Sequence, residues 1–245
     1  MIGTTPAVGW YVFGIVPSDA SPPVGTYLVE RGPLAAVAAE VPLAEFGEDA
    51  LRDHLNDRAW LEDKVRVHDA VLHSLVGVTT VVPLRFGAIY RDLDDVRRLL
   101  AERSAAFEEV LERVRGRVEL GVKAWFDPSR VERPPAASSG REYLLRRQDE
   151  LGSVRQAAAM AAAAHQSLAA VADDAVVNRP QARELTGRDE QMLLNGAYLV
   201  AVGDSRLADE FARLAAEHAA AGLEFELTGP WPPYNFARLD EEEPA

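Results

Sequence analysis

The histidines are the side chains of this sequence best suited to bind a metal or to transfer protons. There are five of them, and His68 and His73 are the closest pair. On a helix, a separation of five residues turns two side chains about 140° apart. A metal-binding pair on a helix is usually spaced by four residues, which keeps both rings on one face. We therefore expect no metal site and no catalytic histidine, and we interpret these residues as surface or core-edge histidines.

The residues that usually serve thiol chemistry, phosphate binding and nucleophilic catalysis are missing from the sequence or are unsuitably spaced. The chain contains no cysteine, which excludes disulfides, thiolate zinc sites and cysteine nucleophiles. It has neither a phosphate-binding glycine motif (GxxxxGK[ST] or GxGxxG) nor a GxSxG turn for a nucleophilic serine. Acidic pairs such as Glu108 and Glu109 are adjacent, so on a helix they point to different faces, as solvated charges do. We expect a protein that is not an enzyme and holds no cofactor.

The net charge of the chain limits the classes of partner that it can bind. It carries 26 basic and 39 acidic side chains, a net charge of −13. This excess of negative charge opposes binding to nucleic acid and to anionic membranes. The N-terminal residues lack the basic and apolar regions of a signal peptide, and no apolar run reaches the roughly 20 residues that span a bilayer. We therefore expect a cytoplasmic protein that binds neither nucleic acid nor membranes.

The first part of the chain mixes strand and helix patterns and is predicted to be an α+β domain of residues 1–116. The expected strands are 10–16, 26–30, 34–41 and 78–90. The expected helices are 49–76, with a first helical turn near Leu51–Leu55, and a helix that starts near Asp92 or Asp94 and ends near residue 114. Gly116 is placed as the stop of the last helix. We put the domain boundary there.

The second part, residues 117–239, has the element order β-α-β-β-α-β. The expected elements are a strand at 118–126, a long alanine-rich helix at 141–171, strands at 175–182 and 192–202, a helix from Asp204 or Ser205 to Gly222, and a strand at 223–227. This order predicts a ferredoxin-like domain, an antiparallel sheet with two helices on one face. The remaining residues, 240–245, form an acidic tail that we expect to be solvated.

Two segments combine aromatic, glycine and proline residues, and the first also contains a cation. The first is Val82–Gly87, where Pro83 cannot donate to a sheet ladder and predicts an edge or a bulge. The second is Thr228–Phe236, whose three prolines fix φ and remove donors, so we expect an extended, stiff backbone outside any ladder. Its large aromatic side chains either fold back over the boundary between the domains or face a partner.

These segments supply the candidate binding residues. The hypothesis is a partner-binding surface or a domain seam that consists of Arg85, Phe86, Gly87, Trp231, Pro232, Pro233, Tyr234 and Phe236.

Four stretches, taken in order along the chain, carry a family resemblance. They are Tyr11–Val16, Pro83–Gly87, Gly140–Leu144 and Gly229–Phe236, and the last is the most specific. Together they resemble the gas vesicle protein GvpF/GvpL family over nearly the whole chain. The resemblance implies an N-terminal α+β domain, a C-terminal modified ferredoxin-like domain and no catalytic residues.

The resemblance also implies a function. It is an accessory or minor structural role in gas vesicle assembly, through binding of the hydrophobic shell protein GvpA and other gas vesicle accessory proteins, in the cytoplasm or on the vesicle. An acidic partner that covers apolar shell surface before assembly would hinder aggregation, which needs no active site. The alternative is a regulatory protein that binds a small molecule on its ferredoxin-like sheet, an argument from fold alone.

Overall fold

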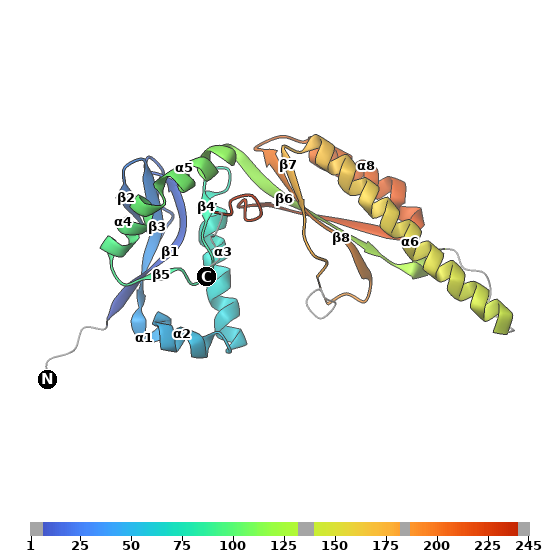
Figure 1. The fold of residues 1–245 in the computed structure, drawn as a ribbon, viewed down its shortest axis with the longest axis horizontal. Coiled ribbons are helices and arrows are strands. Elements are labelled where there is room, and N and C mark those ends of the chain that lie inside the picture. The colour runs from blue at the N-terminus through green and yellow to red at the C-terminus, as the bar shows by residue number, and fades with distance from the viewer. Residues whose placement is uncertain (1–6, 132–139, 182–186, 240–245) are drawn as a thin grey trace. The chain divides into compact units, whose positions relative to one another are not determined.

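The structure is a computed structural model that describes residues 7–131, 140–181 and 187–239 (Figure 1). By its contacts the chain divides into two compact units, Met1–Val118 with Trp231–Ala245, and Glu119–Pro230. Residues 231–239, which we expected in the second domain, therefore belong to the first unit. The reason is packing, because Ala237 is buried in the core of the first unit and Leu239 packs against that core.

The first unit is built on one antiparallel sheet. Its strands are β1 (Val8–Pro17), β2 (Tyr27–Arg31), β3 (Leu34–Pro42), β4 (Val82–Pro83) and β5 (Ile89–Tyr90). They are ordered β2-β3-β1-β4, and β5 also pairs with β1. The three strands expected at 10–16, 26–30 and 34–41 are confirmed.

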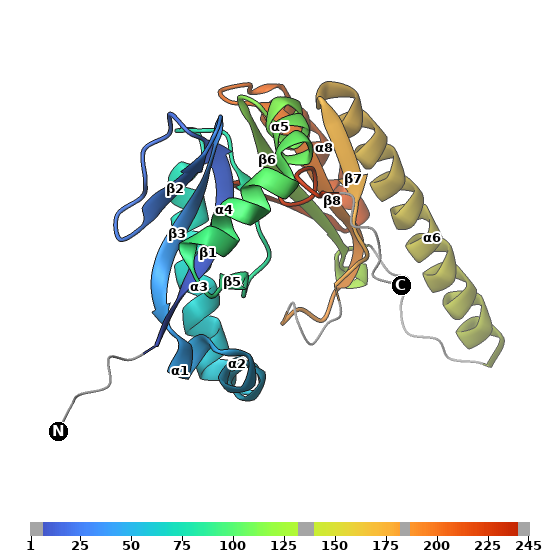
Figure 2. The same ribbon diagram turned by 60° about the vertical axis from the view of Figure 1, so that its left-hand side comes forward.

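Helices cover both faces of this sheet. They are α1 (Leu43–Phe46), α2 (Glu48–His54), α3 (Arg58–Leu75), α4 (Leu93–Glu102) and α5 (Ser104–Arg113). Figure 2 shows α4 in front of the sheet and α3 behind it. The core is accordingly split: Tyr11 and Phe13 pack with the α3 side, and Val12 and Ile15 pack with the α4 and α5 side. A register shift in β1 between Val12 and Gly14 switches the side-chain alternation, so Val12 and Ile15 pack on the same side although they are three residues apart.

Two expectations for this unit are wrong in detail and one is confirmed. The strand expected over 78–90 is two short strands, β4 and β5, with a turn where Gly87 has a φ of 86°. The helical region expected over 49–76, with a first turn near Leu51–Leu55, is confirmed as α2 and α3, and Asp57 caps α3 by accepting from two backbone N–H groups. The helix expected over 94–114 breaks into α4 and α5 at Arg103, whose φ and ψ of −113° and 18° are not helical.

The second unit has the predicted ferredoxin-like topology. Its elements are β6 (Arg117–Phe126), η1 (Pro128–Arg130), α6 (Gly140–Val171), β7 (Asp174–Val177), β8 (Gln191–Ala201), α8 (Arg206–His218), η2 (Ala219–Ala221) and β9 (Leu223–Trp231). The strand order β7-β8-β6-β9 places the two central strands of the βαββαβ unit side by side. Helices α6 and α8 lie next to each other along the sheet (Figure 1). The predicted α+β class is confirmed.

Small side chains let α6 lie close to its sheet. Ala157, Ala161 and Ala164 are each at most 2% exposed. The ring of His165 lies 2.9 Å from the hydroxyl of Tyr198 on β8, measured from Nδ1 to Oη. This polar pair crosses an otherwise apolar layer.

The last strand is longer than expected. We expected a ladder only over 223–227, but β9 continues to Trp231 through a cis peptide bond between Gly229 and Pro230. The part outside the ladder is a turn, in which the Pro233 carbonyl accepts from the N–H groups of Phe236 and Ala237 at 3.0 and 2.8 Å. Only the second half of the stiff segment thus leaves the sheet.

Candidate functional site

The site begins with a polar contact between the sheet and α3 of the first unit. The Tyr11 hydroxyl lies 2.8 Å from Nδ1 of His68 and accepts the Gly87 N–H at 3.1 Å. Which of the two groups donates in the contact between Tyr11 and His68 depends on the tautomer of the imidazole ring. Both side chains are at most 4% exposed.

Burial controls the protonation of this pair. It raises the pKa of Tyr11 to about 12, against which the Gly87 hydrogen bond acts in the opposite direction. Burial also lowers the pKa of His68, and the charge of Asp69 and a backbone hydrogen bond with Leu84 only partly oppose this shift. At neutral pH the pair is therefore uncharged.

A pH dependence of stability follows from the lowered His68 pKa. The unfolded chain binds a proton at this histidine at a higher pH than the folded chain does, so we expect the free energy of unfolding to fall as the pH drops below about 6.5. His68→Gln should show a shallower fall between pH 7 and pH 5 in urea titrations at each pH. Equal slopes for both proteins would contradict the assignment.

The Tyr11 contact holds one wall of a cavity. Residues 84–88 are tied to β1 by the Leu84 N–H to the Phe13 carbonyl at 2.9 Å and by the Val12 N–H to the Ala88 carbonyl at 2.8 Å. Behind them is a cavity of about 820 Å³ within the first unit. Its walls come from α3, the segment 82–90, the α4 and α5 region and residues 234–239.

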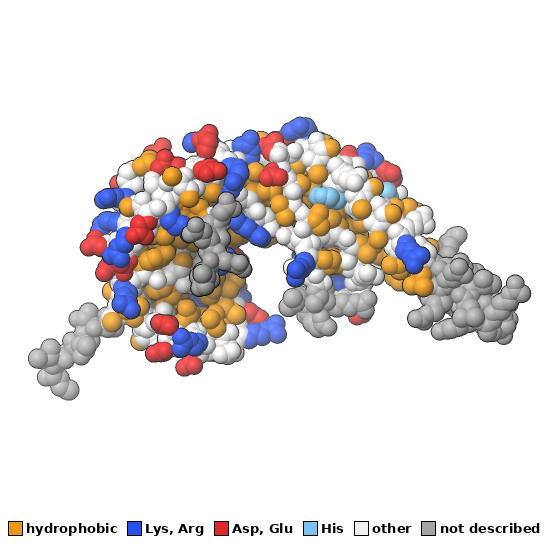
Figure 3. Space-filling model, in the orientation of Figure 1, with side chains coloured by type: hydrophobic (Ala, Val, Ile, Leu, Met, Phe, Trp, Pro, Cys, Tyr) orange, Lys and Arg blue, Asp and Glu red, His pale blue; other side chains and the backbone are white. Residues whose placement is uncertain are grey.

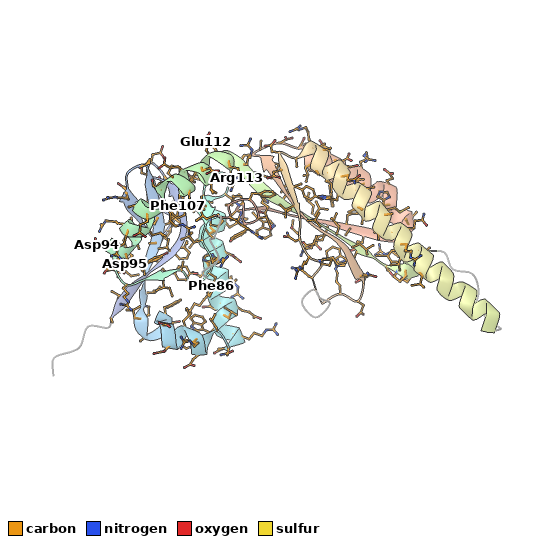
Figure 4. The ribbon with its side chains drawn as sticks, in the orientation of Figure 1. Phe86, Asp94, Asp95, Phe107, Glu112 and Arg113 are labelled. Atoms are coloured by element: carbon orange, nitrogen blue, oxygen red, sulfur yellow. The ribbon has the colours of Figure 1, made fainter. Side chains whose placement is uncertain are left out.

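The lining of the cavity is mixed. Its apolar walls include Phe86 and Phe107, labelled in Figure 4 on the β4–β5 segment and on α5. Its polar residues are His68, Asp69, Arg85, Tyr90, Arg103, Tyr234 and Arg238. The space-filling view shows hydrophobic side chains at the surface over α3 of the same unit (Figure 3).

The structure brings several candidate residues together from distant parts of the chain. Arg85, Phe86 and Tyr234 all line the cavity. The Tyr234 hydroxyl donates to Oδ1 of Asp69 at 3.1 Å. The first and second candidate segments therefore meet on one surface, although they are far apart in sequence.

The other candidate residues lie around this surface. Trp231 is 41% exposed, and its ring packs edge to face on His73 at 5.9 Å between centroids. Pro232, Pro233 and Phe236 are buried. Gly87 supplies the turn and the N–H that meets Tyr11. The assignment of these residues to partner binding or to a domain seam stays a prediction.

The sequence analysis did not identify the residues that fix the wall of the cavity or that contribute charge to its lining. Tyr11, His68 and Arg103 are the most important of them. His68 gave a signal, because it falls three residues after Val65 and four before Leu72, on the apolar side of α3. Tyr11 and Arg103 gave no such signal in a single sequence.

In the second unit, the sheet face opposite α6 and α8 carries an aromatic and ionic cluster. The Arg188 guanidinium lies 4.1 Å over the Trp125 ring and bonds to Glu224 at 2.9 Å. Arg130 bonds to the same carboxylate at 3.1 Å.

Metal-binding clusters and membrane-spanning helices are both missing from the described part of the chain. No group of three or more His, Asp or Glu side chains is placed to hold a metal ion there. Among the helices of residues 7–131, 140–181 and 187–239, none has the length and apolar content needed to cross a bilayer.

Comparison with protein families gives one match that spans the sequence. Residues 9–238 match the model described as gas vesicle synthesis protein GvpL/GvpF. A curated relative, "Gas vesicle protein L" of Streptomyces sp. (strain CB03234), is 38% identical over 253 aligned positions, which cover 95% of this chain and 94% of the relative.

Solved structures give the same fold. The crystal structure of GvpF from Anabaena sp. PCC7120 matches with a TM-score of 0.69 at 19% identity, over 97% of this chain and 99% of that one. GvpF from Microcystis aeruginosa matches with a TM-score of 0.66 at 19% identity, over 94% and 99% of the two chains. At this identity the two structures support the architecture alone.

Proposed function

The chain belongs to the gas vesicle GvpL/GvpF family and has a gas vesicle role, and from this premise we propose that it is a non-enzymatic assembly factor that binds the shell protein GvpA. The surface that we propose for this contact is the cavity rim with the adjacent Trp231 and Tyr234. We also propose that it acts in the cytoplasm, together with other gas vesicle proteins.

One observation carries this proposal. Two turns that lie more than a hundred residues apart in sequence meet around the same cavity, namely Arg85–Gly87 and the turn that follows β9 at 232–237. Beside this cavity Trp231 is 41% exposed and Tyr234 is 36% exposed. Large aromatic side chains that remain partly exposed beside a cavity with apolar and polar walls are typical of a surface that binds another protein. Because the turn is already fixed by the Pro233 carbonyl, little order has to be gained on binding.

Co-expression tests the proposal. We expect the chain to increase the amount of shell protein in the supernatant of a cell lysate, and the variant Trp231→Ala with Tyr234→Ala to lose most of that increase. Tyr27→Ala is the matched control, because Tyr27 is an exposed aromatic residue of the same unit on the distant strand β2. A double variant that folds and retains the full increase would exclude this surface.

Two forms of the role remain within the proposal. The protein acts during assembly only, or it stays in the vesicle wall as a minor component. Immunoblots of vesicles washed in high salt separate these forms, because a wall component stays with the vesicles and a transient factor does not.

A further inference from the structure

We propose that the cavity of the first unit binds an acidic, amphipathic peptide segment of the partner protein, with apolar side chains inside and a carboxylate on Arg85 and Arg103. This inference rests on the proposed function, because it specifies how the partner is recognised. It adds the chemistry of the bound segment.

Charge is the first observation that supports this inference. The chain as a whole carries a net charge of −13. Among the described residues the cavity lining has the opposite balance, since it includes three arginines, Arg85, Arg103 and Arg238, and one carboxylate, Asp69, while burial lowers the pKa of His68. Asp69 already accepts a hydrogen bond from Tyr234. A local excess of guanidinium groups in an acidic protein favours a carboxylate ligand.

The apolar part of the lining is the second observation. Leu84, Phe86 and Leu99 are half-buried at the cavity, and Phe107 closes it from α5. A volume of about 820 Å³ lies within the roughly 300–1,000 Å³ of typical ligand sites. A ligand with only charged groups would leave these walls without contacts. The lining therefore fits a segment that has apolar side chains beside its acidic ones.

Preorganisation of the two arginines is the third observation. Arg85 follows Leu84, whose N–H is bonded to β1, and it precedes Gly87, whose N–H is bonded to Tyr11. Arg103 occupies the junction between α4 and α5, where its backbone caps both helices. Both arginines thus extend from backbone that the core holds in place. A fixed backbone under the charges lowers the ordering cost of binding.

Charge reversal in the full-length chain tests the inference. We expect Arg85→Glu and Arg103→Glu each to weaken binding of purified shell protein about tenfold, and to make the dissociation constant less sensitive to salt. Arg52→Glu is the control with the same charge change, because Arg52 lies on α2 outside the cavity and pairs with Glu48. It should change the constant less than about twofold, since an exposed ion pair contributes little. Circular dichroism and melting curves confirm that each variant folds.

The outcomes separate this inference from the proposed function. If shell protein binds the original chain and both cavity variants equally, the inference is overturned and the proposed function stands. If shell protein does not bind the original chain, the proposed function fails, and the inference is tested with the synthetic peptide Ac-LEELFEEL-NH2. Binding of this peptide that is lost in Arg103→Glu supports the inference, whereas equal binding of its glutamine counterpart overturns it.

Two further arms exclude other occupants. A chain that ends at Leu239 should bind the peptide with an affinity within about threefold of that of the full chain. If the shortened chain binds the peptide much more tightly, the chain's own acidic residues 240–243 compete for the arginines, and the inference is overturned. Succinate should not raise the melting temperature. A rise that Arg103→Glu abolishes, without peptide binding, would identify a small-anion site and overturn it as well.

Discussion

Truncation of Phe107 to alanine is expected to destabilise the first unit by about 3 kcal/mol. Phe107 is 0% exposed and packs in the core formed by the sheet with α4 and α5. Removing a buried phenylalanine ring costs roughly 3–5 kcal/mol, because apolar contacts are lost and a void remains. Since Phe107 also borders the existing cavity, we place the effect at the lower end of this range.

Urea unfolding followed by tryptophan fluorescence measures this loss, because Trp10 and Trp60 report on the first unit. Tyr27→Ala is the control, since the Tyr27 side chain is 59% exposed and should lose less than about 1 kcal/mol. If Phe107→Ala were no more destabilised than this control, the helix pair α4 and α5 would not close the core as described.

The second large effect concerns Gly222, which ends η2 before β9. Its φ is 76°, and a Cβ atom there would lie 2.7 Å from the Asp127 carbonyl oxygen. The Gly222 carbonyl itself accepts the Asp127 N–H at 2.9 Å, so neither backbone can easily move away. We expect Gly222→Ala to destabilise the second unit by about 3 kcal/mol, from left-handed strain plus the clash.

Gly203→Ala separates the two causes. Gly203 has a similar φ of 83°, but a Cβ atom at this position would have no neighbouring atom within 4 Å, so its variant carries the strain alone, about 1 kcal/mol. The difference between the two variants in thermal or urea unfolding then isolates the clash. Equal losses would mean that the close approach of η2 to Asp127 is absent in solution.

Local patterns predicted the second unit better than the first. Its helices and strands each carry their own signal, such as the alternation at Leu223–Leu227, and their order alone indicates the ferredoxin-like topology. In the first unit the wrong predictions lie where an apolar pattern that favours a strand also contains proline and glycine, which favour a turn. Pro83 and Gly87 sit in an apolar run that reads as one strand, and the backbone breaks at both.

The candidate site was predictable only in part. Arg85, Phe86 and Tyr234 were found because unusual combinations of residue types mark their segments. The contact that joins these segments to α3, Tyr234 to Asp69, spans 165 residues and has no local signature. Arg103 looks like an ordinary helix residue until the break between α4 and α5 places it at the cavity.

We propose above all that the protein works by covering shell protein rather than by converting a substrate. The most direct measurement is sedimentation of purified shell protein with and without the purified full-length chain. We predict that the chain keeps shell protein in the supernatant in a fixed molar ratio, and that Trp231→Ala with Tyr234→Ala abolishes this effect. Shell protein that sediments equally with and without a folded chain at micromolar concentration would contradict the claim.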